Sequence, residues 1–251
     1  MNRKTLTRML WVMMPALWVA CGPAADPVSE TNPTSPDVRG AALLNVPDRF
    51  AEPPPPLVLP DLIQLSESLQ TQIRTQHARV LELSEDGDGV SGVVGEAYGE
   101  LGMILMATDL EATATDAFLH AHSLVPSEMR WPYYLAQLFR ENGDTPSAIE
   151  FYERALRLDP TYLAAQVWLG EVYLDASRPE DAEAAFERAL GLNPSSAAAL
   201  SGMGRTALAV GDAERAVEYL EQALAVGPTA WNLHYSLAAA YRTLGDLEKV
   251  E

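Results

Sequence analysis

AIEFYERALRLDP, residues 148–160, recurs along the chain with the same spacing of small, aromatic and proline residues. The related stretches are ATDAFLHAHSLVP (114–126), AEAAFERALGLNP (182–194) and AVEYLEQALAVGP (216–228). Their closing residues, Pro126, Pro160, Pro194 and Pro228, follow one another at intervals of 34 residues. A fixed period of this length indicates a repeat architecture, in which each unit packs only on its neighbours.

A second set of residues keeps the same register in the first half of each unit. The pairs are Leu101-Gly102, Leu135-Ala136, Leu169-Gly170, Met203-Gly204 and Leu237-Ala238. Small residues let two helices approach closely, and large ones such as Phe139, Tyr173 and Tyr241 fill the space between them. In the middle of three units Gly143, Gly211 and Gly245 precede Asp144, Asp212 and Asp246. Glycine ends a helix, aspartate caps the next and proline stops it, so each unit is predicted to be a helical hairpin.

This pattern resembles the tetratricopeptide repeat: a Leu-small pair and an aromatic residue in one helix, then Ala, aromatic, Ala and Pro. The resemblance covers residues 95–251. The expected units are 95–128, 129–162, 163–196, 197–230 and a partial unit, 231–251. The implied fold is all-α, a right-handed superhelical solenoid of antiparallel helical hairpins. The fifth unit stops early in its second helix. Either its first helix caps the array, or the chain is a fragment of a longer protein. We favour the fragment.

Residues 1–20 have the build of a secretion signal. Arg3, Lys4 and Arg8 precede an uncharged stretch that is shorter than the roughly twenty residues needed to span a membrane. The sequence Val19-Ala20-Cys21-Gly22 resembles a bacterial lipobox, although Trp18 stands where leucine is usual. We expect an exported periplasmic protein, anchored to the outer membrane through lipid on Cys21. The alternative is ordinary cleavage near Ala24 or Ala25, which removes Cys21.

Three segments separate the signal from the repeats. Residues 22–60 are rich in proline and predict an extended, disordered linker, which is a spacer, a plain leader or a Pro-rich ligand for a partner. Residues 61–83 carry an apolar stripe, with Asp61 as the expected N-cap, and predict an amphipathic helix that caps the array. Residues 84–94 read as an acidic, Gly-rich hinge.

Bulk composition and motifs argue for binding rather than catalysis. The formal net charge of −18 disfavours nucleic acid, which needs clustered Lys and Arg. Cys21 is the only cysteine, which excludes an intramolecular disulfide and a Cys-rich zinc site. No nucleophile elbow, phosphate-binding loop or zinc-helix motif occurs, and His120 and His122 are two residues apart on one helix and therefore face different sides. We therefore predict no enzyme activity, no cofactor and no metal.

The resemblance places the binding surface on the concave side, which the first helix of each unit lines. Mapping by register gives the predicted groove: Arg130, Tyr133, Gln137, Arg140, Val167, Glu171, Leu174, Arg205, Asn232, Tyr235 and Arg242. Guanidinium groups bind carboxylates and tyrosines offer flat apolar contact, so the expected ligand is an extended or helical peptide with acidic and apolar residues. Alternatively, these arginines pair with Glu171 and neighbouring acids and bind nothing.

Three functional hypotheses follow. The first is a non-catalytic scaffold or adaptor for protein interactions in the bacterial cell envelope. The second is an accessory or regulatory repeat domain of a larger protein whose catalytic part lies beyond residue 251. The third is a structural envelope protein that self-associates through its last unit.

Overall fold

The computed structural model describes residues 56–85, 91–227 and 231–246, except the side chains of residues 231 and 232. These ranges form helices and no strands. The helices are α2 (Glu67–Glu85), α3 (Ser91–Ala107), α4 (Glu111–Leu124), α5 (Arg130–Glu141), α6 (Thr145–Leu158), α7 (Leu163–Asp175), α8 (Pro179–Leu192), α9 (Ala197–Val210), α10 (Ala213–Val226) and α11 (Trp231–Leu244). The predicted all-helical class is confirmed.

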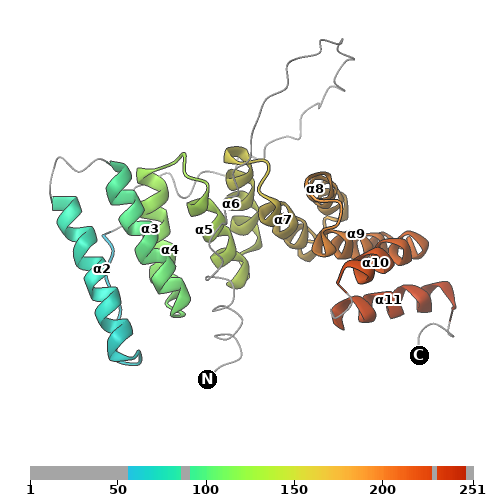
Figure 1. Cartoon of the computed structure of the whole chain (residues 1–251), viewed down its shortest axis with the longest axis horizontal. Helices are drawn as coiled ribbons and strands as arrows, with labels where there is room; N and C mark the ends of the chain where they lie inside the picture. The colour runs from blue at the N-terminus through green and yellow to red at the C-terminus, as the bar shows by residue number, and fades with distance from the viewer. Residues whose placement is uncertain (1–55, 86–90, 228–230, 247–251) are drawn as a thin grey trace, which may run out of the picture.

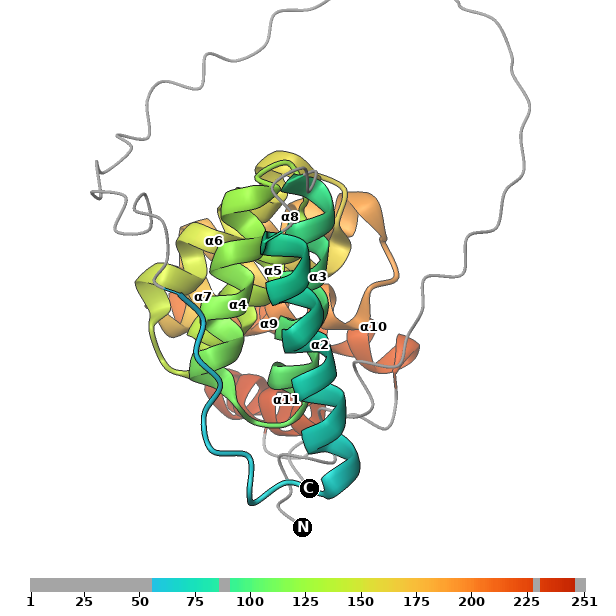
Figure 2. The same cartoon turned by 90° about the vertical axis from the view of Figure 1, so that its left-hand side faces the viewer.

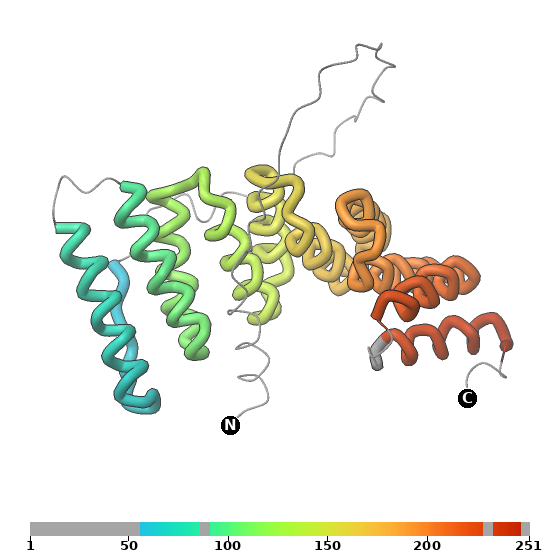
Figure 3. Tube along the Cα trace, viewed as in Figure 1, coloured from blue at the N-terminus to red at the C-terminus, as the bar shows by residue number. Residues whose placement is uncertain are grey.

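The helices pack as successive hairpins. Helix α3 pairs with α4, α5 with α6, α7 with α8 and α9 with α10, while α11 opens a fifth unit. Each second helix also contacts the first helix of the next unit. The units follow one another along the long axis, and the axes of α9–α11 lie across those of α2–α5 (Figure 1, Figure 3). A view from the α2 end shows the later units stacked behind the earlier ones (Figure 2). The protein is a helical solenoid.

Left-handed residues end the first helix of every unit. Gly143, Gly211 and Gly245 have φ angles of 76°, 85° and 77°. Asp144 and Asp212 then cap the second helices by accepting hydrogen bonds from the backbone N–H groups of Ser147 and Arg215. The predicted turn chemistry is therefore confirmed at Gly143-Asp144 and Gly211-Asp212, while the helix that Asp246 is predicted to cap lies outside the described residues. In the other two described turns the left-handed position is occupied by Asp109 and Ser177 rather than glycine, with φ angles of 61° and 57°.

Replacing Ser177 by glycine should raise the free energy of unfolding by up to about 1 kcal/mol. A left-handed L-residue costs roughly 1–2 kcal/mol, part of which glycine gives back through its greater freedom in the unfolded chain. Urea unfolding measures the change. The matched control is Gly211→Ser at the equivalent turn, which should shift stability the opposite way; equal shifts of one sign would contradict this account.

Small and aromatic residues of the repeat build the core. Ala114, Ala148, Ala182 and Ala216 have no exposed surface, and neither do Phe118, Tyr152, Phe186 and Leu220 in the following turn of each second helix. Tyr173 and Tyr241 are buried, and each donates a hydrogen bond from its hydroxyl to a carboxylate of the preceding second helix, Glu153 at 2.7 Å and Glu221 at 2.6 Å. The aromatic positions thus join consecutive units.

Helix α2 packs against α3 at the start of the array. Its Ile73 and Val80 are buried, and Gln76 Nε2 donates to the Ala97 carbonyl oxygen at 3.1 Å. The helix begins later than predicted, at Glu67. Asp61 does not cap it, because its carboxylate accepts the Ile63 N–H in a local turn at 3.0 Å. The expected hinge, 84–94, is also too long, since α2 reaches Glu85 and α3 starts at Ser91.

Several sequence predictions fall outside the described residues. They are the signal at 1–20, Cys21, the Pro-rich linker up to residue 55, and residues 247–251 of the partial unit. At the end of the linker Leu57 and Leu59 pack against the core, and Leu62 is buried. Among the described residues no helix is long and apolar enough to cross a membrane.

Candidate interaction surface

The first helices α3, α5, α7, α9 and α11 succeed one another along the solenoid (Figure 1). We call the solvent-facing sides of these helices the first-helix face. All the predicted groove residues belong to these helices. Several apolar side chains on it are only half-buried: Met106, Leu174 and Leu208, which share one register position, and also Met103 and Val167. The face therefore combines partly exposed apolar groups with the arginines described next.

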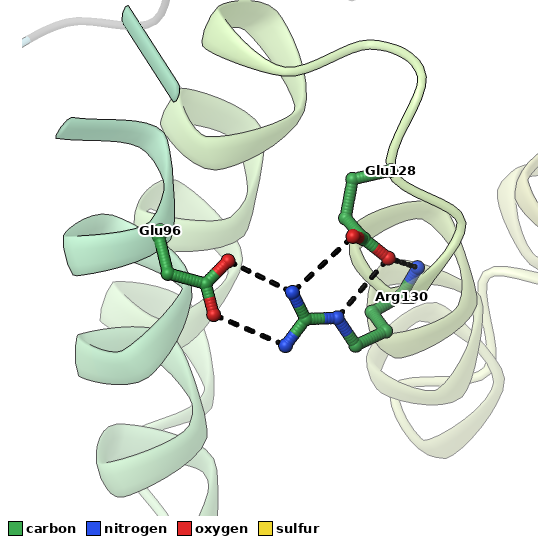
Figure 4. Close-up of polar contacts among 3 residues, drawn as sticks. All are labelled: Glu96, Glu128 and Arg130. Atoms are coloured by element: carbon green, nitrogen blue, oxygen red, sulfur yellow. Dashed lines mark hydrogen bonds and ion pairs between the residues drawn. The ribbon is translucent and has the colours of Figure 1, made fainter. Parts of the chain in front are cut away.

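Arg130 at the start of α5 is held between two carboxylates (Figure 4). Its Nη1 and Nη2 donate to the two oxygens of Glu96 on α3 at 3.1 and 2.8 Å. Its Nε lies 3.0 Å from Oε1 of Glu128. Hydrogen bonds from Arg130 lower the pKa of Glu128, and the bond to Glu128 is the largest cause that raises the pKa of Arg130. This arginine already has the ligands that a partner's carboxylates would supply.

Replacing Arg130 by methionine should lower the free energy of unfolding at pH 7 by less than about 1 kcal/mol, because ion pairs this exposed are screened by water. The difference from wild type should shrink in acid. Since the folded pKa of Glu128 lies below its ordinary 4.5, its contribution is present above that pH and is lost as the pH falls through the folded value. Urea unfolding at pH 7, 5 and 3 measures both variants; a gap that widens in acid contradicts the assignment.

A second arginine of the face is neutralised in the same way. Arg205 on α9 forms a hydrogen-bonded ion pair with Glu171 on α7. Both this pair and Glu96–Arg130 join residues 34 positions apart, one full unit. The sequence alternative, in which the arginines pair with Glu171 and neighbouring acids, is thus confirmed for Arg130 and Arg205. Opposite charges one repeat apart in the same register were the signal that could have shown it.

Arg140 has a different environment. Its guanidinium carbon lies 4.2 Å from the centroid of the Trp168 ring on α7, and its Nη2 donates to Gln137 Oε1 at 3.0 Å. Its ion-pair contact, with the neighbouring Glu141, is longer, at 3.6 Å. The buried Arg140 Nε and the buried Tyr152 hydroxyl find no acceptor among the described residues. Burial raises the pKa of Tyr152, and the charge of Arg140 partly opposes this shift.

Tyr133 and Gln137, both predicted to line the surface, lie inside the protein. Each is only 8% exposed, and Gln137 Nε2 donates to the Tyr133 hydroxyl at 3.0 Å. The ring of Tyr162, which precedes α7, packs edge-on against Tyr133 with centroids 4.9 Å apart. The loop before α7 therefore covers Tyr133, and Gln137 in turn accepts a hydrogen bond from the Arg140 guanidinium. Sequence reasoning missed both covering residues, Tyr162 and Trp168.

The equivalent positions of the fifth unit are more exposed than those of the second. Tyr235 and Arg242 on α11 stand in the same register as Tyr133 and Arg140, and Tyr235 is 73% exposed. Arg242 is also exposed, and no ion pair joins it to another described residue. The side chain of Asn232 lies outside the described residues. Of the predicted arginines whose side chains are described, Arg140 thus has only the longer contact with Glu141, and no ion pair joins Arg242 to another described residue.

The described ranges contain no candidate metal site. They contain no group of three or more His, Cys, Asp or Glu side chains that could hold a metal ion. His120 stacks on Tyr98 of α3 with ring centroids 4.5 Å apart, so it takes part in packing the first hairpin.

The fold defines a class of protein: a solenoid of helical hairpins in which the second helix of each unit packs on the first helix of the next. Two sequence profiles described as tetratricopeptide repeat match, one over residues 139–205 and the other over 111–162 and 201–249. Together they span residues 111–249, more than half of the 251 residues. The chain belongs to the tetratricopeptide repeat family. Proteins of this family bind protein or peptide partners.

Solved structures show the same fold. The MamA protein matches with a TM-score of 0.59 and 22% identity, over 62% of this chain and 85% of its own. A tetratricopeptide repeat protein from Parabacteroides merdae gives a TM-score of 0.59 and 19% identity, over 74% and 77%. YrrB, described as having an unusual peptide-binding site, gives 0.57 and 19%, over 70% and 86%. A search of curated protein sequences found no significant match.

Proposed function

We propose that this protein is a non-catalytic scaffold that binds a peptide segment of a partner protein on its first-helix face. The observation that carries the proposal is the half-buried apolar series on that face, above all Leu174 and Leu208 in consecutive units. Their own units leave these leucines partly uncovered, so a partner can bury them further. Each square ångström of apolar surface removed from water contributes about 25 cal/mol.

Two further features support a protein ligand. The net charge of −18 opposes binding to nucleic acid. The similar protein YrrB is itself described as having a peptide-binding site. Guanidinium groups recognise carboxylates, and Arg140 and Arg242 on this face hold no carboxylate of the described chain at hydrogen-bond distance.

Selection of a displayed random-peptide library on the purified protein tests the binding function. We expect selected peptides to lose affinity at least tenfold for Leu174→Glu, because a carboxylate in the contact removes apolar burial worth about 1.4 kcal/mol or more. The matched control is Leu158→Glu, which changes a 41% exposed leucine at the end of the second helix α6. Peptides that bind the Leu174 and Leu158 variants equally well would reject the first-helix face as the binding surface.

We also propose that the protein is exported and anchored in the outer membrane by lipid on Cys21. The support is the lipobox-like Val19-Ala20-Cys21-Gly22 after a short positively charged and apolar segment. Mass spectrometry of the mature N-terminus tests this, with Cys21→Ser as the control. An N-terminus at Cys21 with diacylglycerol is expected, whereas an unmodified chain beginning at Asp26 would overturn the anchor.

A further inference from the structure

One register position on the first-helix face carries either an apolar residue or an arginine in each unit. Residues 34 apart, each from the last turn of its first helix, are Met106, Arg140, Leu174, Leu208 and Arg242. We call them the outer row. All are half-buried or exposed, and in order they read apolar, cation, apolar, apolar, cation. Consecutive units therefore present a pair of leucines flanked on both sides by arginine.

The arginines of the outer row differ from the others on the face. Arg130 and Arg205 each hold a carboxylate one unit away within hydrogen-bond distance. The same register in the outer row offers no such acid, because the residues one unit from Arg140 and Arg242 are Met106, Leu174 and Leu208. The carboxylate nearest Arg140 is that of Glu141 on the same helix, at 3.6 Å, which is longer than the hydrogen-bonded pairs of Arg130 and Arg205.

The way Arg140 is held suits it to an incoming anion. Trp168 supports one side of the guanidinium and Gln137 takes Nη2, which fixes the plane of the group. The Arg140 side chain keeps 27% of its surface exposed. A planar, pre-positioned guanidinium binds a carboxylate with little loss of side-chain entropy.

The accessible strip is narrow. Beside the outer row, Tyr133, Gln137 and Ser201 are each 8% exposed and add little surface. An extended chain occupies about 5 Å across, against about 10 Å or more for a helix with its side chains. An extended peptide therefore fits the row better than a helical one.

We infer, on the basis of the proposed function, that the partner segment is an extended peptide with two acidic side chains that flank an apolar stretch. Arg140 and Arg242 take the acids, and Leu174 and Leu208 contact the apolar stretch. Taking about 8–10 Å, the spacing of packed helices, for each step between successive first helices, the three steps from Arg140 to Arg242 span about 24–30 Å. At about 3.3 Å per residue, the two acids stand about seven to nine residues apart.

Capped fluorescent peptides test this register. Each carries two aspartates separated by spacers of about three to eleven alternating Leu and Ser residues, a range that brackets the expected spacing. Fluorescence anisotropy should show the tightest binding at spacings near seven to nine. Replacing either aspartate by asparagine should weaken that peptide about tenfold, as expected for one charged hydrogen bond.

Variants assign each acid to its arginine. Arg140→Gln and Arg242→Gln should each weaken the two-aspartate peptide about tenfold, yet leave unchanged the peptide that lacks the matching aspartate. Arg157→Gln, an exposed arginine on α6, is the control. Arg140→Lys, which keeps the charge, should bind more tightly than Arg140→Gln, and circular dichroism verifies that all variants are folded.

The outcomes separate the two proposals. Binding that is lost in Leu174→Glu but is insensitive to both arginine variants and to spacing overturns the two-acid inference and leaves the proposed function standing. Binding that survives Leu174→Glu overturns the proposed function as well. Absence of binding at every spacing, while library-selected peptides without acids bind at Leu174, also overturns the two-acid inference alone.

Discussion

Replacing Phe186 by alanine should lower the free energy of unfolding by about 3–5 kcal/mol, as for other fully buried aromatic residues. Phe186 on the second helix α8 packs against two first helices, α7 and α9. A methyl group built on Gly170 of α7 would lie 2.6 Å from its ring, and one on Gly202 of α9 would lie 2.3 Å away. The ring thus occupies the space that these glycines leave, and its removal uncouples the third and fourth units.

Glycine substitutions test the same contact from the other side. Gly202→Ala should lower the free energy of unfolding by about 1–3 kcal/mol, because the ring has no room to retreat toward Gly170. Gly191→Ala is the matched control: no atom lies within 4 Å of its new methyl group, so it should stabilise α8 by about 0.5–1 kcal/mol. Urea unfolding measures all three changes, and equal effects of the two alanines would contradict the packing account.

The repeat register made most of the fold predictable. The residues that set it, such as Ala148, Tyr152 and Gly170, are all buried, so each position is constrained by contacts that recur in every unit. Helix boundaries within the units follow from the same residues, since glycine and aspartate in the turns satisfy local hydrogen bonds. The same contacts recur in every unit, so the order of the helices could be predicted from the sequence of this chain alone.

Features outside the register were predicted less well. Pro60-Asp61 has the composition of a helix start, yet Asp61 forms a turn with Ile63 and α2 begins only after Ser66. Capping residues make turns as readily as helix starts, and here the turn places Leu62 in the core. That burial depends on residues far away in the sequence.

The helices that carry the candidate site residues could be predicted from the sequence, but the ion pairs and the burial of those residues could not. Register placed Arg130, Arg140 and Arg205 on first helices. Which of them were already paired depended on carboxylates one unit away, and that required the orientation of neighbouring helices. The burial of Tyr133 likewise comes from Tyr162, a residue of the following loop. The register of a single helix does not include the residues of adjacent helices and loops, and these residues determine which side chains stay exposed.

Replacing Trp131 by alanine should cost about 3–5 kcal/mol at the junction of the first two units. Trp131 on α5 is fully buried, and a methyl group built on Gly99 of α3 would lie 2.1 Å from its ring. The indole also stacks on Phe118 of α4 with centroids 6.1 Å apart. The side chain therefore contacts both helices of the first unit, and its loss should free that unit from the array.

The indole N–H of Trp131 is buried without an acceptor among the described residues. Trp131→Phe removes this unsatisfied donor together with part of the ring, so it should cost much less than Trp131→Ala. Gly99→Ala should cost about 1–3 kcal/mol in the wild type. In the Trp131→Ala background the same change should become neutral or favourable, because the clash is gone and alanine favours the helix.

Hydrogen exchange distinguishes a local effect from a global one. Repeat arrays are stabilised by contacts between nearest neighbours, so weakening one junction should release the units on its shorter side first. In Trp131→Ala the amides of α3 and α4 should lose protection, while those of α9 and α10 keep theirs. Uniform loss of protection along the whole array would show instead that the solenoid unfolds as a single cooperative unit.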